Sequence, residues 1–417
     1  MDKISVEGGR PLSGEVRVSG AKNAALPLMA AAILAPLTLD NIPNLRDLST
    51  MGRLLTYMGG RVARDNERME LDLSGLSRPE APYQLVKTMR ASALVLGPLL
   101  TRHGRARVSL PGGCAIGLRP LDRHLKALEA MGAVINLSGG YVEARTPAGG
   151  LRGAEINFDD VTVTGTENLM LAAVLARGRT TINGAAREPE VTDTARALLA
   201  MGARISGLDT DQLIIDGVNE LKPAVHQVMP DRIEAGTLIV AGAMAGGRIV
   251  VKGPPHAALA AVYDKLRETG VSLTPAGDDL IVEAGTAVKS TDITTRPYPG
   301  FPTDMQAQFM ALMTIGDGVS MINETIFENR FMHVSELGRL GAEISLEGHA
   351  AVVRGVPRLS GAPMMATDLR ASASLILAAL AARGRSEISR VYHLDRGYDR
   401  LDEKLAALGA DIQRVPE

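Results

Sequence analysis

The sequence predicts an α/β protein of two domains, each assembled from copies of one repeating unit. Three observations lead to this prediction. The chain has 417 residues, whereas single hydrophobic cores rarely grow beyond about 250–300 residues. A pattern of helix end, glycine and strand recurs six times along the chain. Each recurrence is preceded by a second, more uniformly apolar helix and by short alternating strands.

The recurring segment is clearest at residues 405–412, which read LAALGADI. Its apolar spacing predicts an amphipathic helix that ends at a glycine C-cap and continues into a strand. The glycines of the six copies lie at 68- to 73-residue intervals and are Gly59, Gly132, Gly202, Gly270, Gly341 and Gly409. Units of about 70 residues are long for a solenoid. The copies also differ at their polar helix starts, so we expect a closed assembly with one composite site.

The second helix of each unit is apolar nearly all round, which predicts burial between layers. In chain order its expected starts are Lys22-Asn23, Thr88-Met89-Arg90, Thr166-Glu167-Asn168, Asp231-Arg232, Thr303-Asp304 and Thr367-Asp368-Leu369-Arg370. Several of these helices are expected to end at a glycine, as at Gly178, Gly247 and Gly384. Alternating patterns predict strands at residues 105–110, 180–184 and 247–252. The amphipathic helices should face solvent on one side.

Composition limits the classes of function. Hydrophobic residues make up 46% and charged residues 22% of the chain, and the net charge is −2. This balance is ordinary for a soluble protein and argues against nucleic-acid binding. The N-terminus lacks the pattern of a signal peptide, and the longest uncharged run, residues 23–39, is short and contains two prolines. We expect a cytoplasmic protein without a membrane span.

A glycine-rich loop at residues 111–120 contains Cys114, the single cysteine. One cysteine excludes an internal disulfide and a multi-cysteine zinc site. The glycines allow the backbone to approach a ligand closely, and Arg119 favours a lowered thiol pKa. A lone cysteine is also commonly a small buried hydrophobe, so the loop alone leaves its role open.

Cations stand at several of the buried helix starts. The N-terminus of a helix presents free N–H groups and the positive end of the helix dipole, so it attracts anions. The cations there are Lys22, Arg90, Arg232 and Arg370. Taken singly, each arginine is more often a solvated side chain. Together they favour a bound phosphate or carboxylate, because cations oppose the dipole unless an anion is present.

Two further stretches carry titratable groups. Asp304 lies at a helix start, where it either stabilises the helix or serves chemistry. Residues 392–398 read YHLDRGY, which is either a polar surface turn or part of a site. The sequence lacks a Walker loop and a complete dinucleotide fingerprint. Its seven histidines show no metal-ligand spacing, so we expect neither metal nor cofactor.

These motifs resemble the UDP-N-acetylglucosamine 1-carboxyvinyltransferase family from end to end. The resemblance is carried by residues 19–23, 111–120, 186–190, 302–308, 328–333, 367–373 and 395–398. EPSP synthase, which transfers enolpyruvyl to shikimate 3-phosphate, is related in fold and reaction. The cysteine loop distinguishes the two, and this chain has it.

The resemblance implies a two-domain inside-out α/β barrel, with three βαβαββ repeats in each domain. Domain one would comprise residues 1–21 and 230–417, and domain two residues 22–229. The site would lie in a cleft between the domains, with the Cys114 loop as a lid. These six implied repeats agree with the six recurring segments.

The implied reaction joins phosphoenolpyruvate to the 3-hydroxyl of UDP-N-acetylglucosamine and releases phosphate, the first committed step toward bacterial peptidoglycan. The resemblance assigns the acid role to Cys114 and the base role to Asp304. Among the cations, Lys22, Arg119 and Arg396 would bind phosphate. Arg330 and Arg370 would support them, oriented by Asp368. Asn23 and Arg90 would contact phosphoenolpyruvate and the sugar nucleotide, respectively. The remaining implied UDP-N-acetylglucosamine contacts are Arg119, Pro120, Leu121, Asp122, Arg123, Thr162, Val163 and Ile326.

Two other functions are considered. One is transfer to shikimate 3-phosphate, as in EPSP synthase. The other is a non-catalytic regulator that binds a UDP-sugar, which would need neither an acid nor a base. The expected partners are small-molecule substrates, and the expected assembly state is a monomer or a weak homo-oligomer.

Overall fold

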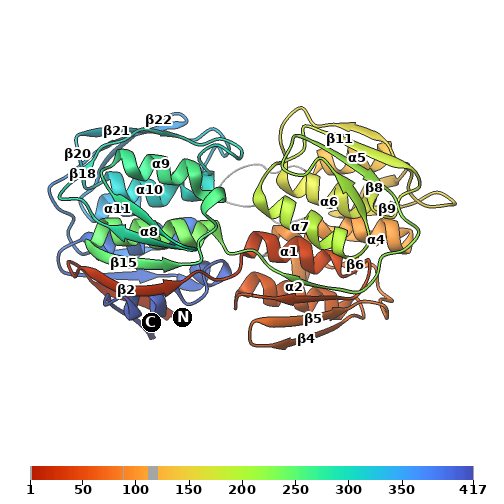
Figure 1. The fold of residues 1–417 in the computed structure, drawn as a ribbon, viewed down its shortest axis with the longest axis horizontal. Helices are drawn as coiled ribbons and strands as arrows, with labels where there is room; N and C mark the ends of the chain where they lie inside the picture. The colour runs from red at the N-terminus through yellow and green to blue at the C-terminus, as the bar shows by residue number, and fades with distance from the viewer. Residues whose placement is uncertain (1, 88, 111–120, 417) are drawn as a thin grey trace. The chain divides into compact units, whose positions relative to one another are not determined.

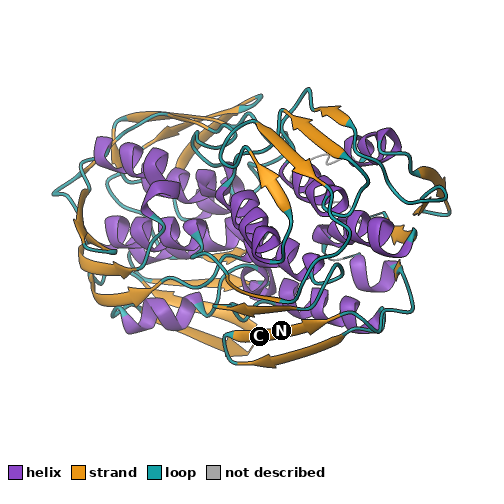
Figure 2. Cartoon of the chain, turned by 45° about the vertical axis from the view of Figure 1, so that its right-hand side comes forward, coloured by secondary structure: helices purple, strands orange, loops and turns teal. Residues whose placement is uncertain are grey.

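The computed structural model describes residues 2–87, 89–110 and 121–416. Helices and strands alternate along the chain, which confirms the α/β fold class (Figure 2). The described chain divides into two compact units. Unit 1 holds the residues up to Ser19 and from Pro230 onward, and unit 2 holds the described residues between Gly20 and Met229.

Six four-stranded sheets with one common topology occur among the described residues, three in each unit. The contiguous example contains β10 (Glu155–Asn157), α6 (Val163–Ala173), β11 (Arg179–Asn183), α7 (Pro189–Ala200), β12 (Arg204–Ser206) and β13 (Gln212–Asp216). β10 and β11 are parallel, and β11, β13 and β12 pair antiparallel in that order. This is the βαβαββ repeat implied by the resemblance.

The other two sheets of unit 2 follow the same pattern. Their elements are α1 (Lys22–Ala31), β3 (Leu37–Asp40), α2 (Arg46–Tyr57), β4 (Arg61–Asp65), β5 (Arg68–Asp72), β6 (Glu80–Ala81), α3 (Tyr83–Val86), η1 (Arg90–Val95), α4 (Leu96–His103), β7 (Arg105–Ser109), α5 (Asp122–Ala130), β8 (Val134–Ser138), β9 (Tyr141–Arg145) and β14 (Ala224–Gln227). Their strand orders are β14-β3-β5-β4 and β6-β7-β9-β8.

Unit 1 contains the remaining elements. They are β1 (Asp2–Glu7), β2 (Leu12–Arg17), α8 (Arg232–Ala245), β15 (Gly247–Lys252), η2 (His256–Leu259), α9 (Ala260–Glu268), β16 (Ser272–Ala276), β17 (Asp279–Glu283), β18 (Val288–Lys289), β19 (Ile293–Thr294), η3 (Thr303–Met305), α10 (Gln306–Met313), β20 (Gly316–Asp317), β21 (Val319–Asn323), α11 (Val334–Arg339), β22 (Glu343–Glu347), β23 (Ala350–Arg354), β24 (Pro363–Met365), α12 (Leu369–Ala381), β25 (Arg385–Ser389), η4 (Val391–Arg396), α13 (Leu401–Ala407) and β26 (Asp411–Pro416).

Three of the six sheets are completed by a strand from a distant part of the sequence. β14 pairs parallel with β3 in unit 2. In unit 1, β2 pairs parallel with β15, so the red N-terminal strand runs beside the green one in Figure 1. β1 lies between β25 and β26 and pairs antiparallel with both. The first described strand of the chain is therefore an interior strand of the last sheet.

The uniformly apolar helices are buried, as predicted. In α6, every residue from Gly165 to Ala173 is buried, and α8, α10 and α12 are buried to a similar extent. The three helices of unit 1 pack against one another, and their N-terminal turns carry the polar residues considered below. The second helices are amphipathic, since α2 exposes Arg46, Ser49 and Arg53 while it buries Leu54 and Leu55.

The six repeat glycines end the second helices in a left-handed conformation, with φ between +89° and +105°. After α7, the N–H of Gly202 donates to the carbonyl of Leu199, and the N–H of Ala203 donates to the carbonyl of Leu198, both at 2.9 Å. This pair of bonds is the Schellman motif. The predicted glycine C-caps are therefore confirmed.

Some predicted helix limits were wrong. α6 begins at Val163 rather than at Thr166, because the Thr162 side chain accepts the N–H of Gly165 at 3.2 Å and caps the helix earlier. The starts at Arg90 and Thr303 are 3₁₀ turns that lead into α4 and α10. The helix ends predicted at Gly178, Gly247 and Gly384 lie C-terminal to the observed ends. The helices end at Ala173, Ala245 and Ala381, since the chain needs further residues to turn into the next strand.

Candidate active site

Asp304 in unit 1 is held by two arginines. It lies in the turn η3, directly before the buried helix α10. Its Oδ1 accepts a hydrogen bond from Nη2 of Arg330 at 2.7 Å. Its Oδ2 accepts from Nε and Nη2 of Arg370 at 3.0 and 2.7 Å. The arginine side chains are nearly buried, whereas 24% of the Asp304 side chain is exposed. The structure thus brings three predicted site residues together at a partly open carboxylate.

Electrostatics keep this cluster ionised. Burial alone would raise the pKa of Asp304, but the charges of Arg370 and Arg330 outweigh it and hold the pKa well below its usual 3.8. Burial would lower the pKa of Arg370, and the charge of Asp304 raises it instead. Asp304 is therefore a carboxylate at neutral pH, which is the state that can accept a proton.

The start of α12 is fixed by Asp368. Its carboxylate accepts the backbone N–H groups of Arg370 at 2.8 Å and Ala371 at 3.0 Å. This N-cap satisfies two donors that have no partner inside the helix. Asp368 therefore contacts Arg370 through the backbone and holds the first turn that carries the guanidinium. Its predicted role in orienting the arginines remains a prediction.

A buried polar network adjoins the backbone of Asp304. Nε2 of Gln308 donates to the backbone oxygen of Asp304 at 2.9 Å and contacts the hydroxyls of Tyr398 and Thr237, each at 3.1 Å. Burial raises the pKa of Tyr398, so its hydroxyl keeps its proton. The Arg370 guanidinium lies 5.3 Å from the centre of the Tyr398 ring. The sequence placed Gln308 and Tyr398 within motifs but assigned neither a role.

Arg396 and Ile326 are two further predicted residues of unit 1. Arg396 is half-buried at the end of η4. The neighbouring His393 has a lowered pKa. Burial is the main cause, and the positive charge of Arg396 adds to it. Ile326 lies in the loop after β21, and its N–H donates to Oε1 of Glu324 at 2.8 Å. Sequence reasoning missed Glu324, because a single glutamate after a strand carries no distinguishing pattern.

Lys22 and Asn23 begin the buried helix α1 of unit 2. Only 8% of Lys22 is exposed. Its Nζ lies 3.5 Å from Oδ2 of Asp47, which is in the first turn of α2. Asn23 is half-buried. A lysine ammonium is thus kept at a helix N-terminus, where an anion is favoured.

Five predicted residues lie where α5 and α6 begin, and they are Leu121, Asp122, Arg123, Thr162 and Val163. Arg123 donates to the carboxylate of Asp160 in the loop before α6. The two helix starts are therefore joined by an ion pair that the sequence did not predict. Because both partners are well exposed, the pair contributes little stability.

Four predicted residues are not tested by side-chain geometry. Cys114, Arg119 and Pro120 lie outside the described residues. The backbone of Arg90 begins η1, and its side chain lies outside the described part of the chain. Their roles stay predictions.

Unit 2 also contains a group of buried carboxylates. Glu167 on α6 is buried near Glu188 and Glu190, which lie at the start of α7. Burial first, and then the negative charges of Glu190 and Glu188, raise the pKa of Glu167 well above its usual 4.5. Burial and these like charges therefore favour the neutral form of Glu167. The sequence placed these residues in helix starts and in the 186–190 motif without assigning this property.

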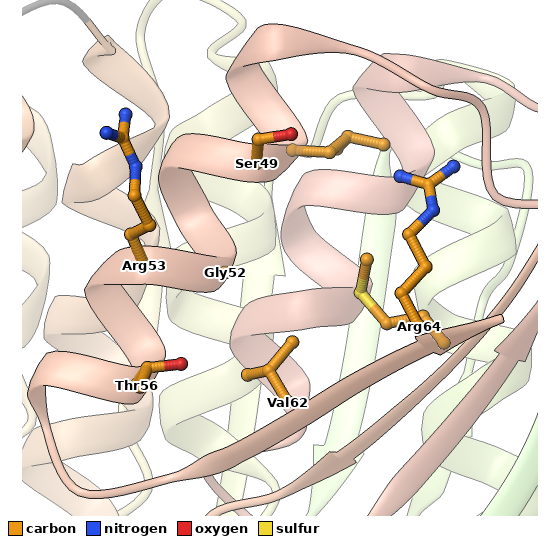
Figure 3. A pocket seen from close by; sticks show the side chains of 8 residues that line it. Ser49, Gly52, Arg53, Thr56, Val62 and Arg64 are labelled. Carbon is orange, nitrogen blue, oxygen red and sulfur yellow. The ribbon is translucent and has the colours of Figure 1, made fainter.

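A separate pocket of about 330 Å³ lies in unit 2 between α2 and the β4–β5 hairpin (Figure 3). It contains none of the predicted site residues. Its Arg64 donates to the backbone oxygens of Asn66 and Ile42 at 3.0 and 3.1 Å, so that guanidinium is already engaged.

Within residues 2–87, 89–110 and 121–416, no cluster of three or more histidine or acidic side chains could hold a metal. The same residues contain no helix both long and apolar enough to span a bilayer.

Comparisons with known proteins show which family the chain resembles. The family model of EPSP synthase (3-phosphoshikimate 1-carboxyvinyltransferase) matches residues 6–405. The UDP-N-acetylglucosamine 1-carboxyvinyltransferase of Myxococcus xanthus is 58% identical over 419 residues, which cover 99% of each chain. The enzyme of the same name from Geotalea daltonii is 57% identical, with complete coverage of both chains.

Solved structures share the fold. The enolpyruvyl transferase NikO from Streptomyces tendae superposes with a TM-score of 0.89 at 29% identity and covers 99% of each chain. EPSP synthase from Acinetobacter baumannii superposes with a TM-score of 0.77 and full coverage of both chains. Its 18% identity shows the fold alone. The near-complete coverage and the high sequence identity show that the chain belongs to the EPSP synthase family and, within it, to the UDP-N-acetylglucosamine 1-carboxyvinyltransferases.

Proposed function

We propose that this enzyme transfers the enolpyruvyl group of phosphoenolpyruvate to the 3-hydroxyl of UDP-N-acetylglucosamine and releases inorganic phosphate. The structural observation that supports the proposal best is the cluster of Asp304, Arg330 and Arg370. It combines an ionised, partly exposed carboxylate with two buried guanidiniums. Acid–base chemistry on an anionic substrate requires both kinds of group.

The proposed reaction has two stages. In the addition, C3 of phosphoenolpyruvate gains a proton from Cys114, and the sugar oxygen bonds to C2. The hydroxyl proton passes to Asp304. Asp304 then releases this proton to solvent. In the elimination, C3 loses a proton to the Asp304 carboxylate and the C2–O bond to phosphate breaks, which leaves the enolpyruvyl ether and free phosphate. The Cys114 thiolate regains its proton from solvent. Lys22, Arg119 and Arg396 bind the phosphate in this proposal, with Arg330 and Arg370 as supporting cations.

Asp304 is a weak base in this structure because two arginines stabilise its charged form. Proton transfer to it becomes favourable as the sugar oxygen bonds to C2, since the hydroxyl proton then becomes strongly acidic. A low pKa also allows Asp304 to release the proton readily to solvent. The carboxylate is thereby restored before the second proton transfer, in the elimination.

The remaining proposed contacts follow from the family membership. Asn23 contacts phosphoenolpyruvate, Arg90 contacts the sugar nucleotide, and Asp368 orients the arginines. UDP-N-acetylglucosamine is bound by residues 119–123, Thr162, Val163 and Ile326. We further propose a cytoplasmic enzyme of peptidoglycan synthesis, and hence of cell shape and division, that works as a monomer or a weak homo-oligomer.

The test is phosphate release from phosphoenolpyruvate, with UDP-N-acetylglucosamine or shikimate 3-phosphate as acceptor. We expect release with the first acceptor only. Cys114→Ala should lose most of the activity, roughly a hundredfold or more as expected for an acid–base group, and still bind UDP-N-acetylglucosamine in a thermal-shift assay. Cys114→Asp should retain part of the activity, because a carboxyl group can also donate a proton.

Each alternative has its own signature in this assay. Release with shikimate 3-phosphate alone would establish an EPSP synthase activity. Binding of the UDP-sugar without any release would indicate a regulator. Full activity in Cys114→Ala would rule out the acid role of the thiol.

A further inference from the structure

Glu324 is a fully buried carboxylate in unit 1, next to the loop that carries Arg330. It directly follows β21 and is 0% exposed. Oε1 accepts hydrogen bonds from the Thr295 hydroxyl at 2.9 Å and from the N–H groups of Ile326 and Phe327 at 2.8 and 3.2 Å. Oε2 accepts from the Thr303 hydroxyl at 2.8 Å. Four donors thus compensate the cost of burying this group.

The Thr303 hydroxyl connects Glu324 to Arg330. A hydroxyl has one proton to donate. Thr303 donates it to Glu324, so its oxygen is left to accept from Nη1 of Arg330, at 2.7 Å. Nη2 of the same guanidinium donates to Oδ1 of Asp304. The hydrogen bonds therefore run in one direction, from Arg330 through Thr303 to Glu324.

This arrangement fixes the plane of the Arg330 guanidinium. One terminal nitrogen is bound to Thr303 and the other to Asp304, and only 6% of the side chain is exposed. Without the Thr303 contact, the guanidinium could rotate about its long side chain and would meet Asp304 less often. Glu324 also holds the N–H of Ile326, so one buried carboxylate sets two of the predicted site positions.

We propose that Glu324 is a positioning residue of this enzyme, which acts through Thr303 to orient Arg330 against Asp304. The proposal rests on the transferase function proposed above, because that function makes the Arg330–Asp304 geometry relevant to the reaction. A purely structural role is the competing explanation, since Glu324 also anchors the turn at residues 324–327.

Thr303→Val separates the two explanations. Valine keeps the shape of threonine but can neither donate to Glu324 nor accept from Arg330. We expect kcat/KM to fall about tenfold or more, since a hydrogen bond to a charged group contributes roughly 1.5–3 kcal/mol. The acid limb of the pH profile should move to higher pH, because a less constrained Arg330 stabilises the Asp304 carboxylate less. Thr303→Ser should restore both.

Thr295→Val is the matched control. It also removes a buried hydroxyl that donates to Glu324, but one that leads to no arginine. It should lower the unfolding midpoint and leave kcat/KM and the acid limb near those of the wild type. Equal kinetic losses in Thr295→Val and Thr303→Val, or wild-type kinetics in Thr303→Val, would overturn the proposal.

A second measurement tests the positioning role without relying on enzyme activity. The carboxyl carbon of Asp304 can be followed by NMR in protein labelled with ¹³C-aspartate and assigned with Asp304→Asn. Thr303→Val should raise the Asp304 pKa, and Thr303→Ser should not. If the wild type releases no phosphate, the proposed function fails. The NMR result still decides whether Thr303 positions Arg330, because an unchanged titration in Thr303→Val would refute it.

Discussion

Asp304 shows how one carboxylate can be both held in place and available for chemistry. A carboxylate offers about four lone-pair sites. Arg370 occupies two sites on Oδ2, and Arg330 occupies one on Oδ1. The described residues thus leave roughly one site on Oδ1, on a side chain that is partly exposed. We infer that a substrate hydroxyl would meet Asp304 at this oxygen.

Glu167 leads to a prediction about pH. Its Oε1 is buried without a hydrogen-bond partner among the described residues, and its pKa in the folded chain is raised. Above about pH 4.5 the unfolded chain releases this proton while the folded chain keeps it, so the stability contributed by this group falls as pH rises. Glu167→Gln removes that loss. We expect the variant to be more stable than the wild type at pH 8, with an advantage that grows as the pH rises above about 4.5.

The measurement is urea unfolding at pH 8 and near pH 4. The gain from Glu167→Gln should disappear at the lower pH, where the glutamate is protonated in both states. Glu347→Gln, at an exposed position, should change stability little at either pH. A Glu167→Gln variant that is less stable than the wild type at pH 8 would contradict the proposed neutral state.

At the scale of elements, the repeat glycines end a helix and reverse the chain into a strand. Their positive φ is costly for any residue with a Cβ, by roughly 1–2 kcal/mol. The surroundings of the six copies differ, however. A Cβ on Gly341 would meet no atom within 4 Å, whereas one on Gly59 would lie 2.9 Å from the backbone oxygen of Gly75.

This difference predicts unequal costs for the same substitution. Gly341→Ala should lower the free energy of unfolding by about 1–2 kcal/mol through backbone strain alone. Gly59→Ala should cost a further ~1 kcal/mol or more, because backbone must also move. Urea unfolding of the two variants measures both values. Equal losses would mean that the neighbouring Gly75 carbonyl adjusts without cost.

At the scale of the whole molecule, the first and last described strands, β1 and β26, lie side by side in one sheet. β1 lies inside the sheet β24-β25-β1-β26, and Ile4 on that strand is 0% exposed. Residue 4 is therefore a core position, although chain ends are usually tolerant of change. The unit 1 core needs this strand because β1 supplies the fourth strand of its third repeat.

Ile4→Ala should therefore cost about 2–5 kcal/mol, as for a deletion in a packed core. Val225→Ala is the control, because Val225 is 60% exposed on β14, and it should change stability by less than about 0.5 kcal/mol. Hydrogen exchange should show faster opening of β25 and β26 in Ile4→Ala. Protection equal to the wild type in those strands would contradict an interior role for β1.

Two features of the sheets could not be predicted from sequence periodicity: the very short strands and the strands that pair with distant parts of the chain. The glycine spacing identified six units, but β6, β18 and β19 contain only two residues each. A two-residue strand has no detectable alternation. The pairing of β1, β2 and β14 with distant strands depends on long-range contacts, which a local pattern does not encode.

Local chemistry in the sequence determined the six repeats, the buried helices and the glycine caps, because apolar spacing and positive φ act within a few residues. It also identified Asp304 and Arg370 as candidates, and the family resemblance added Arg330. Only the tertiary structure showed that these three residues form one ion-pair cluster. It also showed that Arg330 donates to Thr303, which in turn donates to Glu324. It also decided that the first strand completes the last sheet. Such contacts join residues far apart in the chain, and packing of the whole unit selects them.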